Sequence, residues 1–390
     1  MTMHHSFKNP DFSIAMLGGG QLGKMFLAEA RRLDIKINVL DPNPEAPARK
    51  GADFFKKGDF KDYDTVIKFA SGAGAIVIEI ESVNVDALEE LETRGIPCFP
   101  PSRVLRIIQN KGRQKDFFRD HEIPTSDYKK YKKLESLKID ISKGIRSLPF
   151  VWKIAEGGYD GFGVKIVRNQ KDLDNLAKGE CIVESFENIK KEIGVIVARD
   201  LNNKITSFPP VQMEFHNDTN QVEFVTCPAD ISRNLSQKCT EMAISVGQSL
   251  KTNGLLAVEL FILENDKIVV NELAPRPHNS GHLTIEACNV SQFEQLLRCA
   301  CQFPLSDIKL HSASVMANII GRPDFEGPVK YVGLNDALKI DHAKLHLYGK
   351  TKTRPHRKMG HVTVIGKSIE EARKKAKEFK SLLLVQSEDL

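Results

Sequence analysis

The chain of 390 residues is 41% hydrophobic and 27% charged, so it is large enough for two or three domains with ample cores and has an ordinary globular composition. Its net charge of +5 is too small to demand nucleic acid or an anionic membrane as a partner, and it suits an enzyme that handles phosphates. The first 11 residues hold no apolar signal core, and no apolar run approaches the ~18 residues of a membrane span, so neither export nor membrane insertion is expected. Seven scattered cysteines without zinc-binding spacing predict reduced thiols in a cytoplasmic protein.

The first hundred residues alternate between strand and helix patterns. Short apolar runs predict strands at 13–17, 37–41 and 75–79, and helices are expected from the residues after 20 to about 33 and near 62–71. This alternation indicates a parallel α/β domain that ends near residue 105.

A glycine-rich loop connects the first strand to the first helix. Gly18 to Gly23 fits G-x-G-x-x-G, and Asp41 ends the next strand, as in a dinucleotide-binding fingerprint. The same segment almost fits a phosphate-binding P-loop, but Met25 replaces the hydroxyl residue. We expect a phosphate near this helix N-terminus without assigning a dinucleotide, and a tight turn with no ligand is the alternative.

The rest of the chain is mostly strands with a few helices. A helix is predicted over 103–121 and an exposed, lysine-rich helix over 129–143. Strands are then expected at 150–154, 164–168, 181–184, 193–199, 205–208, 222–226, 255–263 and 268–273, with helices near 236–252 and 291–302. After Pro304 come an apolar run at 314–320, short strands near 344–348 and 360–365, and an amphipathic helix at 369–381. The predicted parts are 1–105, 106–305 and 306–390.

A second glycine loop follows Lys153. Glycines 157, 158, 161 and 163 lie between two predicted strands, so they occupy a hairpin tip and do not open a helix. A tip this rich in glycine can fold over a triphosphate as a lid, and Lys153 would direct its ammonium at the phosphates. A plain flexible hairpin is the alternative.

Two glutamates lie in apolar runs on either side of a turn at 264–267. If the hairpin folds about that turn, Glu259 and Glu272 are directly opposite, where two carboxylates repel unless a cation lies between them. Asn271 adds a neutral oxygen. Few hard oxygen ligands suit Mg²⁺ that also holds substrate phosphates. The alternative is a solvated strand face, which the apolar flanks disfavour.

In order along the chain, several motifs resemble the ATP-grasp superfamily and, within it, the family of N5-carboxyaminoimidazole ribonucleotide synthases. The motifs are Gly18-Gly19-Gly20-Gln21-Leu22-Gly23-Lys24-Met25, Glu79-Ile80-Glu81, Gly157-Gly158-Tyr159-Asp160-Gly161, Cys181-Ile182-Val183-Glu184, the block from Asn271 to His282, and Arg354-Pro355-His356-Arg357-Lys358-Met359-Gly360-His361. The resemblance covers nearly the whole chain. It implies a mixed α/β and α+β protein: a Rossmann-like pre-ATP-grasp domain, an ATP-grasp domain and a small β-rich C-terminal domain.

The resemblance also implies an activity and a site. The activity is that of an ATP-dependent carbon–nitrogen ligase of purine biosynthesis, which carboxylates 5-aminoimidazole ribonucleotide with bicarbonate through carboxyphosphate. The implied ATP contacts are Lys111 and Lys153 at the phosphates, Gly158, Tyr159, Asp160, Gly161, Phe162 and Gly163 in the lid, Glu184, Ser185, Phe186 and Glu187 at adenine, Glu192 at the ribose, and His216, Asn271 and Glu272. Mg²⁺, or Mn²⁺ in its place, is expected on Glu259 and Glu272, and no biotin is expected.

The implied substrate side draws on all three parts of the chain. The expected contacts with the ribonucleotide are Gly20, Gln21, Leu22, Glu81, Arg276, His278 and Asn279, with Lys350 and Arg357 on its phosphate. Lys153, Arg276, His278, Tyr159 and Asp160 are the candidate catalytic residues, and His278 is either a proton shuttle or a plain hydrogen-bonding residue. The resemblance further suggests a homodimer.

Four positions depart from the family pattern. Phe162 stands where a basic residue is usual, Val164 where Gln is common, Lys111 where Arg is frequent and His356 where Gly is common. Because Phe162 removes a charge from the lid, Lys153 is expected to carry more of the phosphate charge. We interpret the departures as variation within one activity.

Three rival functions can be compared with this reading. A related ATP-grasp ligase, such as formate-dependent glycinamide ribonucleotide transformylase, shares the layout but not the lid and Arg357–His361 motifs; a biotin-dependent carboxylase subunit is expected in a longer chain. An NAD-dependent oxidoreductase would explain Gly18–Gly23 and Asp41 but not Lys153 or the glutamate pair. A non-catalytic nucleotide-binding protein would be expected to have lost its metal site, whereas both glutamates are present.

Overall fold

The computed structural model describes residues 11–158, 163–216 and 221–387. Its N-terminal part is a five-stranded parallel sheet in the order β3-β2-β1-β4-β5, as the alternating pattern predicts. The strands are β1 (Ser13–Leu17), β2 (Lys36–Asp41), β3 (Phe54–Lys57), β4 (Ala75–Ile78) and β5 (Cys98–Phe99). The helices of this region are α1 (Gln21–Arg32), the short η2 (Arg49–Gly51), α2 (Tyr63–Ala70) and α3 (Val85–Thr93). The expectations missed β3, β5 and α3.

The predicted helix over 103–121 is wrong as a single element. It is two helices, α4 (Ser102–Ile108) and α5 (Lys111–Asp120), because Asn110 is extended and its side-chain oxygen accepts a hydrogen bond from the Arg113 amide, 3.0 Å away. An asparagine that caps a new helix in this way ends continuity with the one before it. The break also lets the Lys111 amide donate to the carbonyl of Ala155 (2.8 Å), beside the second glycine loop.

The second sheet has four antiparallel strands in the order β6-β9-β7-β8. Its elements are β6 (Tyr128–Tyr131), α6 (Leu134–Ser142), β7 (Phe150–Ile154), β8 (Val164–Val167), α7 (Gln170–Asp174) and β9 (Cys181–Ser185). The expectation of one exposed helix over 129–143 is therefore wrong in its first half. Residues 128–131 pair with β9 and bury Tyr131, so tertiary pairing overrides the lysine-rich local pattern.

The third sheet is the largest and runs β15-β14-β10-β12-β13-β16-β20-β18, with β11 paired to β10. Its strands are β10 (Ile189–Arg199), β11 (Ile205–Ser207), β12 (Val211–Phe215), β13 (Val222–Cys227), β14 (Gly254–Leu263), β15 (Ile268–Ala274), β16 (Ala313–Ile320), β18 (Ala343–Leu347) and β20 (Lys358–Gly366). The helices α8 (Arg233–Leu250), η3 (Asn279–Gly281), α9 (Thr284–Ala287) and α10 (Gln292–Ala300) lie between these strands in the sequence. Strand β12 was not predicted, and the β13–β16 pairing carries the sheet across the boundary expected near residue 305.

The last part adds a small sheet in the order β19-β17-β21 and a long helix. Its elements are β17 (Gly327–Val332), α11 (Leu334–Ala337), β19 (Lys352–Thr353), α12 (Ile369–Leu382) and β21 (Leu384–Ser387). The amphipathic pattern at 369–381 is confirmed as α12, which buries Ala372, Ala376 and Phe379 against the third sheet.

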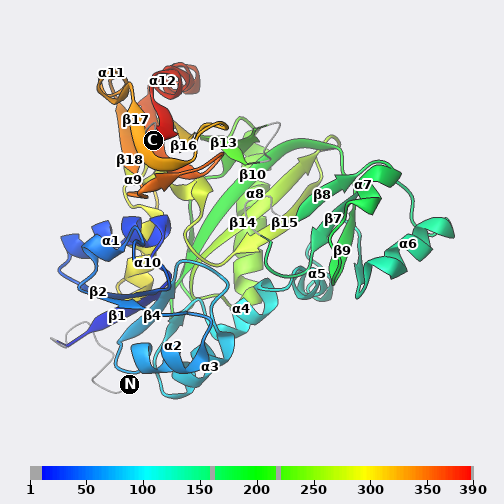
Figure 1. Ribbon diagram of the computed structural model, residues 1–390, viewed down its shortest axis with the longest axis horizontal. Coiled ribbons are helices and arrows are strands. Elements are labelled where there is room, and N and C mark those ends of the chain that lie inside the picture. Colours follow the sequence, from blue (N-terminus) through cyan, green and yellow to red (C-terminus); the bar gives the residue numbers. More distant parts are fainter. Residues whose placement is uncertain (1–10, 159–162, 217–220, 388–390) are drawn as a thin grey trace.

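The three parts meet along one apolar core. Phe26 of α1, Phe293 of α10 and Tyr348 from the C-terminal part belong to the same buried cluster. In Figure 1 the N-terminal part in blue lies beside α10, below the C-terminal part in orange and red, and the four-stranded sheet with α6 and α7 forms the opposite end. Loops from the N- and C-terminal parts are thereby held close to the third sheet.

Candidate active site

The predicted hairpin of β14 and β15 forms, and its register puts Glu259 directly opposite Glu272, with an irregularity just after Glu259. One oxygen of Glu259 lies 3.2 Å from Nε2 of His278, and the other accepts a hydrogen bond from Nδ2 of Asn271 (3.3 Å). Glu272 pairs with the ammonium of Lys111. Burial alone would raise the pKa of Glu259, but His278, followed by Lys111 and Lys153, holds that pKa below its usual value. Each carboxylate thus has a direct side-chain partner in the chain, His278 for Glu259 and Lys111 for Glu272.

The donor set around this pair fits a hard divalent cation that is shared with phosphates. Within the described ranges no group of three or more His, Cys, Asp or Glu side chains is placed to hold a metal. The two opposed carboxylates would therefore leave most of the coordination shell to phosphate oxygens and water, as is usual for Mg²⁺. Asn271 directs its oxygen to Lys153 (2.9 Å) and its nitrogen to Glu259, so in this arrangement its oxygen is already used.

Lys153 lies in the floor of the expected phosphate site. It is 5% exposed, and its ammonium lies 2.9 Å from Oε2 of Glu184, which is 3% exposed. Burial alone would lower the pKa of Lys153, but Glu184 and then Glu272 outweigh it and raise that pKa. Burial alone would also raise the pKa of Glu184, but Lys153 and Lys115 hold it below its usual value. Both groups are charged, and they are fixed before any nucleotide arrives.

The lid and the adenine residues are only partly described. Tyr159, Asp160, Gly161 and Phe162 lie outside the described residues. Gly158 and Gly163 are described, and Gly163 adopts a φ of +79° while its carbonyl accepts from the Ile154 amide (2.8 Å).

The predicted adenine segment, residues 184–187, leaves β9 after Ser185. The amide of Ser185 donates to the carbonyl of Asp127 (2.9 Å), which continues the strand edge. Phe186 is 41% exposed, and the guanidinium carbon of Arg168 lies 5.9 Å from the centre of the Phe186 ring. Glu187 is half-buried. An exposed aromatic ring beside a cation is a surface on which a planar base can stack.

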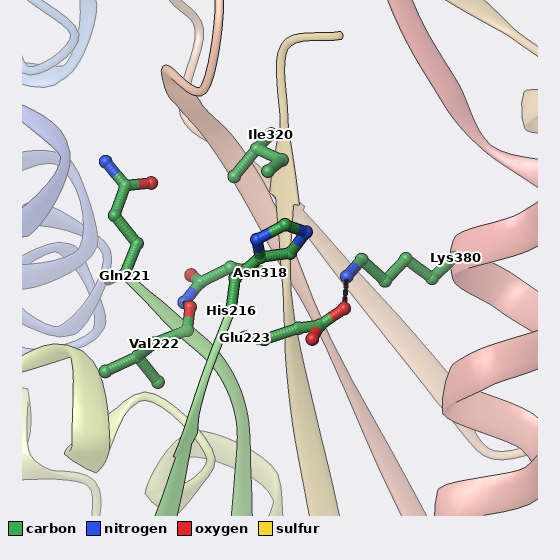
Figure 2. Close-up of a pocket in the computed structure, with 7 residues that line it drawn as sticks. All are labelled: His216, Gln221, Val222, Glu223, Asn318, Ile320 and Lys380. Carbon is green, nitrogen blue, oxygen red and sulfur yellow. Dashed lines mark hydrogen bonds and ion pairs between the residues drawn. The ribbon is translucent and has the colours of Figure 1, made fainter. Parts of the chain in front are cut away.

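Glu192 and His216, the expected ribose and nucleotide contacts, lie in separate hollows. Glu192 lies on β10 opposite Met213 of β12, in an open hollow between these strands. Burial, with Glu259 adding repulsion, raises the pKa of Glu192 to about 7. Figure 2 shows His216 in a different, small pocket, together with Asn318 and with the ion pair of Glu223 and Lys380.

The first glycine loop is already bonded to carboxylates of the chain. The Gly19 amide donates to Asp41 (2.7 Å), whose other oxygen accepts from the Asn43 amide (2.7 Å). The Leu22 amide donates to Glu79 (3.2 Å), a residue that sequence reasoning did not assign. Burial raises the pKa of Glu79 to about 7, although Arg276 and the loop amides act against that rise. Both oxygens of Asp41 are therefore used within this region, which disfavours the dinucleotide fingerprint that the sequence analysis left unassigned.

The residues expected at the ribonucleotide form pairs across the three parts of the chain. Arg276, which follows β15, lies 2.8 Å from Glu81 of the N-terminal part. Lys350 donates to the side chain of Gln21 (2.7 Å) at the start of α1. Gly20 precedes this helix at the same place. These contacts bring the N-terminal loops, the end of β15 and the C-terminal part to one location.

Two further expected residues are used differently. The amide group of Asn279 exchanges two hydrogen bonds with that of Asn318 on β16, at 3.0 and 2.7 Å. Arg357 donates to the backbone carbonyl of Lys352 (2.6 Å), and burial, with Arg354 nearby, lowers its pKa. In this structure Asn279 fastens its loop to the C-terminal part, and Arg357 is turned toward its own loop.

Three domain families match successive parts of the chain. The Ribonucleotide synthetase preATP-grasp domain matches residues 12–109, the ATP-grasp domain matches 116–293, and the Phosphoribosylaminoimidazole carboxylase C-terminal domain matches 314–375. None of the described helices has the length and apolar character needed to cross a membrane.

Whole proteins match over almost their full lengths. The N5-carboxyaminoimidazole ribonucleotide synthase of Bacillus subtilis is 35% identical over 359 residues, which are 91% of each chain. The crystal structure of the synthetase of that name from Thermotoga maritima is 40% identical, with a TM-score of 0.88 over 97% of this chain and 100% of that one. The synthase from Aspergillus clavatus, solved with ADP and 5-aminoimidazole ribonucleotide, is 31% identical, with a TM-score of 0.86 over 97% and 99% of the two chains. This chain therefore belongs to the N5-carboxyaminoimidazole ribonucleotide synthase family of ATP-grasp ligases.

Proposed function

We propose that the protein uses ATP to carboxylate 5-aminoimidazole ribonucleotide with bicarbonate, giving N5-carboxyaminoimidazole ribonucleotide, ADP and phosphate in purine biosynthesis. The observation that carries this proposal is that residues of the expected metal site and of the expected substrate site are neighbours on β15 and directly after it. Glu272 on this strand opposes Glu259 beside the buried Lys153, and Arg276 just after the strand reaches Glu81 of the N-terminal part. Neighbouring residues of one segment would thus take part in phosphoryl transfer and in binding the acceptor substrate.

In the first step, a bicarbonate oxygen attacks the γ-phosphorus of ATP and the bond to the β-phosphate oxygen breaks, giving carboxyphosphate and ADP. Lys153 and Lys111 would hold the phosphates, since both are cations on the floor of the site. Mg²⁺ held by Glu259 and Glu272 would neutralise charge on the transferring group. Lys153 is pre-oriented by Glu184 and Asn271, so little reorganisation is needed at the moment of transfer.

In the second step, the amine of the ribonucleotide attacks the carboxyl carbon, the carbon–oxygen bond to the phosphoryl group breaks, and phosphate leaves with that oxygen. Arg276 would hold the carboxyphosphate by its planar fork, in exchange for its present contact with Glu81. His278, whose Nδ1 lies 2.9 Å from the Ser280 hydroxyl, would take the amine proton or hold the amine in place. Gln21 and Lys350 would meet the ribonucleotide where they now meet each other.

The test is ADP release from purified protein with ATP, Mg²⁺ and bicarbonate, with and without 5-aminoimidazole ribonucleotide. Strong stimulation by the ribonucleotide, lost in Glu272→Ala, supports the proposal. Binding of ATP without stimulation contradicts it, and the same assay with glycinamide ribonucleotide and formate then tests the related ligase.

A homodimer and a cytoplasmic location remain predictions from the sequence. Light scattering on the purified protein measures the first, and a mass of one chain would contradict it. Fractionation of the source cells measures the second.

A further inference from the structure

Lys115 of α5 is a buried lysine to which the reaction scheme above gives no role. It is 2% exposed, and its ammonium forms an ion pair with Oε1 of Glu184 at 3.2 Å. The other carboxylate oxygen of Glu184 pairs with Lys153 at 2.9 Å. Two buried lysines therefore share one buried carboxylate. Burying a lysine costs desolvation free energy. An apolar residue would pack at this position without that cost, so a role for the charge of Lys115 would account for the lysine.

The contacts of Lys115 close a ring around the phosphate floor. Its ammonium donates to the hydroxyl of Thr125 (2.6 Å), and that hydroxyl donates to the carbonyl of Val270 on β15 (2.7 Å). The next residue, Asn271, accepts from Lys153 (2.9 Å), and Lys153 returns to Glu184. The ring ties α5 and β7 to β9 and β15. A closed ring of this kind fixes each member more tightly than separate pairs would.

The charges in this ring are unequal. Glu184 contributes one negative charge and Lys153 one positive charge. Burial lowers the pKa of Lys115 to about 8, so below that pH Lys115 adds a second positive charge and the three groups carry a surplus of one. If Lys115 were neutral, Glu184 alone would cancel Lys153, and the carboxylate would hold that ammonium more closely. The loss of this net positive charge would weaken the attraction for the polyanionic phosphates. The effect is large in a buried site, because little solvent screens the charges there.

We propose that Lys115 is a positioning residue for the nucleotide phosphates: acting through Glu184 and Thr125, it keeps the ammonium of Lys153 aimed and electrically uncancelled. This inference rests on the proposed function of Lys153 as a phosphate contact. Lys115 itself touches no substrate in this account, and it contributes through the ring alone.

Four variants test the inference. Lys115→Met keeps the aliphatic stem but removes the charge, Lys115→Arg keeps the charge, and Thr125→Val removes the tether while both lysines stay. Lys138→Met changes a partly exposed lysine of α6 that is paired with Asp174, and it is the matched control for losing one lysine from the same region. The measurements are KM for ATP, KM for the ribonucleotide, kcat, and the Kd of ADP with Mg²⁺ by calorimetry.

The expected result is a change confined to the nucleotide. Lys115→Met raises KM for ATP and Kd for ADP by roughly tenfold, as expected for removing one partly screened unit charge, and leaves KM for the ribonucleotide unchanged. Thr125→Val raises the same two constants by roughly fivefold, about the net value of one hydrogen bond. Lys115→Arg stays close to wild type, and Lys138→Met matches it.

A purely structural role for Lys115 gives a different result. Lys115→Met would then lower the melting temperature while both ATP constants of the folded protein stay at wild-type values, and this outcome overturns the proposal. If Lys115→Met does not fold, Thr125→Val decides, and unchanged ATP constants in that variant overturn the proposal as well.

The failure of this inference differs from that of the proposed function. A wild-type protein that binds ADP but ignores the ribonucleotide contradicts the function, while the ratio of ADP Kd between Lys115→Met and wild type still tests the role of Lys115.

Discussion

The phosphate floor and the substrate side of the site hold their charges in different ways. On the floor, Lys115, Lys153 and Glu184 are each 5% exposed or less and are paired within the packed sheets. On the substrate side, the paired side chains of Arg276 and Glu81 are 20% and 24% exposed and come from distant parts of the chain. Buried pairs in packed strands resist rearrangement, whereas half-exposed pairs between loops can exchange partners at small cost.

The difference suggests a division of labour. The floor is pre-organised, so it can stabilise charge on a transferring phosphoryl group without moving. On the substrate side, Arg276 and Lys350 are satisfied by Glu81 and Gln21 until a substrate replaces these partners. Removing a floor group should therefore impair the binding of the nucleotide phosphates or their transfer, and removing a substrate-side group should mainly weaken binding of the ribonucleotide.

The largest effect is expected from the floor. Glu272→Ala removes one carboxylate of the expected metal pair and leaves Lys111 without its partner. We expect kcat for ADP release to fall on the order of 10²- to 10³-fold, the range seen when one preorganised electrostatic group is lost. Glu264→Ala, an exposed glutamate in the turn of the same hairpin, is the control. A fall of less than threefold in Glu272→Ala would show that the pair holds no essential cation.

A smaller and more selective effect is expected from Arg276→Lys. The lysine keeps the charge but cannot form the planar fork of two donors. We expect kcat/KM for the ribonucleotide to fall roughly tenfold to a hundredfold, the value of one hydrogen bond to a charged group, while KM for ATP stays unchanged. Steady-state kinetics with each substrate varied in turn makes the distinction. An equal loss of kcat/KM for ATP and for the ribonucleotide would contradict the separate roles of the floor and the substrate side.

Lys350→Met should sharpen the comparison further. Lys350 reaches Gln21 and the carbonyl of Lys358, and it is the expected contact for the ribonucleotide phosphate. We expect KM for the ribonucleotide to rise about tenfold with kcat nearly unchanged, because a phosphate clamp far from the reacting amine binds ground and transition states alike. The 5′-dephosphorylated nucleoside is the matched probe. If Lys350→Met weakens binding of that nucleoside as strongly as binding of the ribonucleotide, Lys350 does not bind the phosphate.

The smallest effect concerns pH and two buried histidines behind the substrate side. Burial holds the pKa values of His282 and His361 well below 6.5, and the cations Lys358 and Arg276 lower that of His282 further. Both are neutral when folded, so the unfolded chain binds more protons below pH 6.5, and stability must fall as the pH drops from there. The slope approaches about 1.4 kcal/mol per pH unit for each imidazole.

Urea unfolding between pH 7 and pH 5 measures this slope. His361→Phe keeps an aromatic ring against His346 and should flatten the slope, whereas His342→Asn, an exposed histidine, should leave it unchanged. An identical slope in all three proteins would mean that folding does not lower the pKa of His361.

The sequence predicts the local features of the site well, because local patterns carry them. The apolar runs around 264–267 specify a hairpin, as predicted. Next to the turn its register is one residue off from the expected one, with Leu260 opposite Val270, and the irregularity after Glu259 restores the predicted opposition of Glu259 and Glu272. The alternating strands and helices before residue 100 likewise indicate a parallel sheet, which forms with two extra strands at its edges.

Other features depend on contacts between distant segments and leave little trace in the sequence. Lys115 reads as one more lysine of a polar helix, and only the packing of α5 under β9 shows that it shares Glu184 with Lys153. Glu79 is the first residue of the Glu79-Ile80-Glu81 motif, yet its bond to the Leu22 amide depends on how β4 lies beside β1. The local pattern at 128–131 favours a helix, and these residues form a strand because they pair with β9.

The most direct test of the account is to follow oxygen from bicarbonate. The protein is incubated with ATP, Mg²⁺, 5-aminoimidazole ribonucleotide and ¹⁸O-labelled bicarbonate, for a time short compared with exchange between bicarbonate and water, and the released phosphate is analysed by mass spectrometry. If the floor transfers the phosphoryl group to bicarbonate and the substrate side then delivers the amine, each phosphate carries one labelled oxygen. Phosphate without the label would contradict the account, because the phosphoryl group would then have gone to another acceptor.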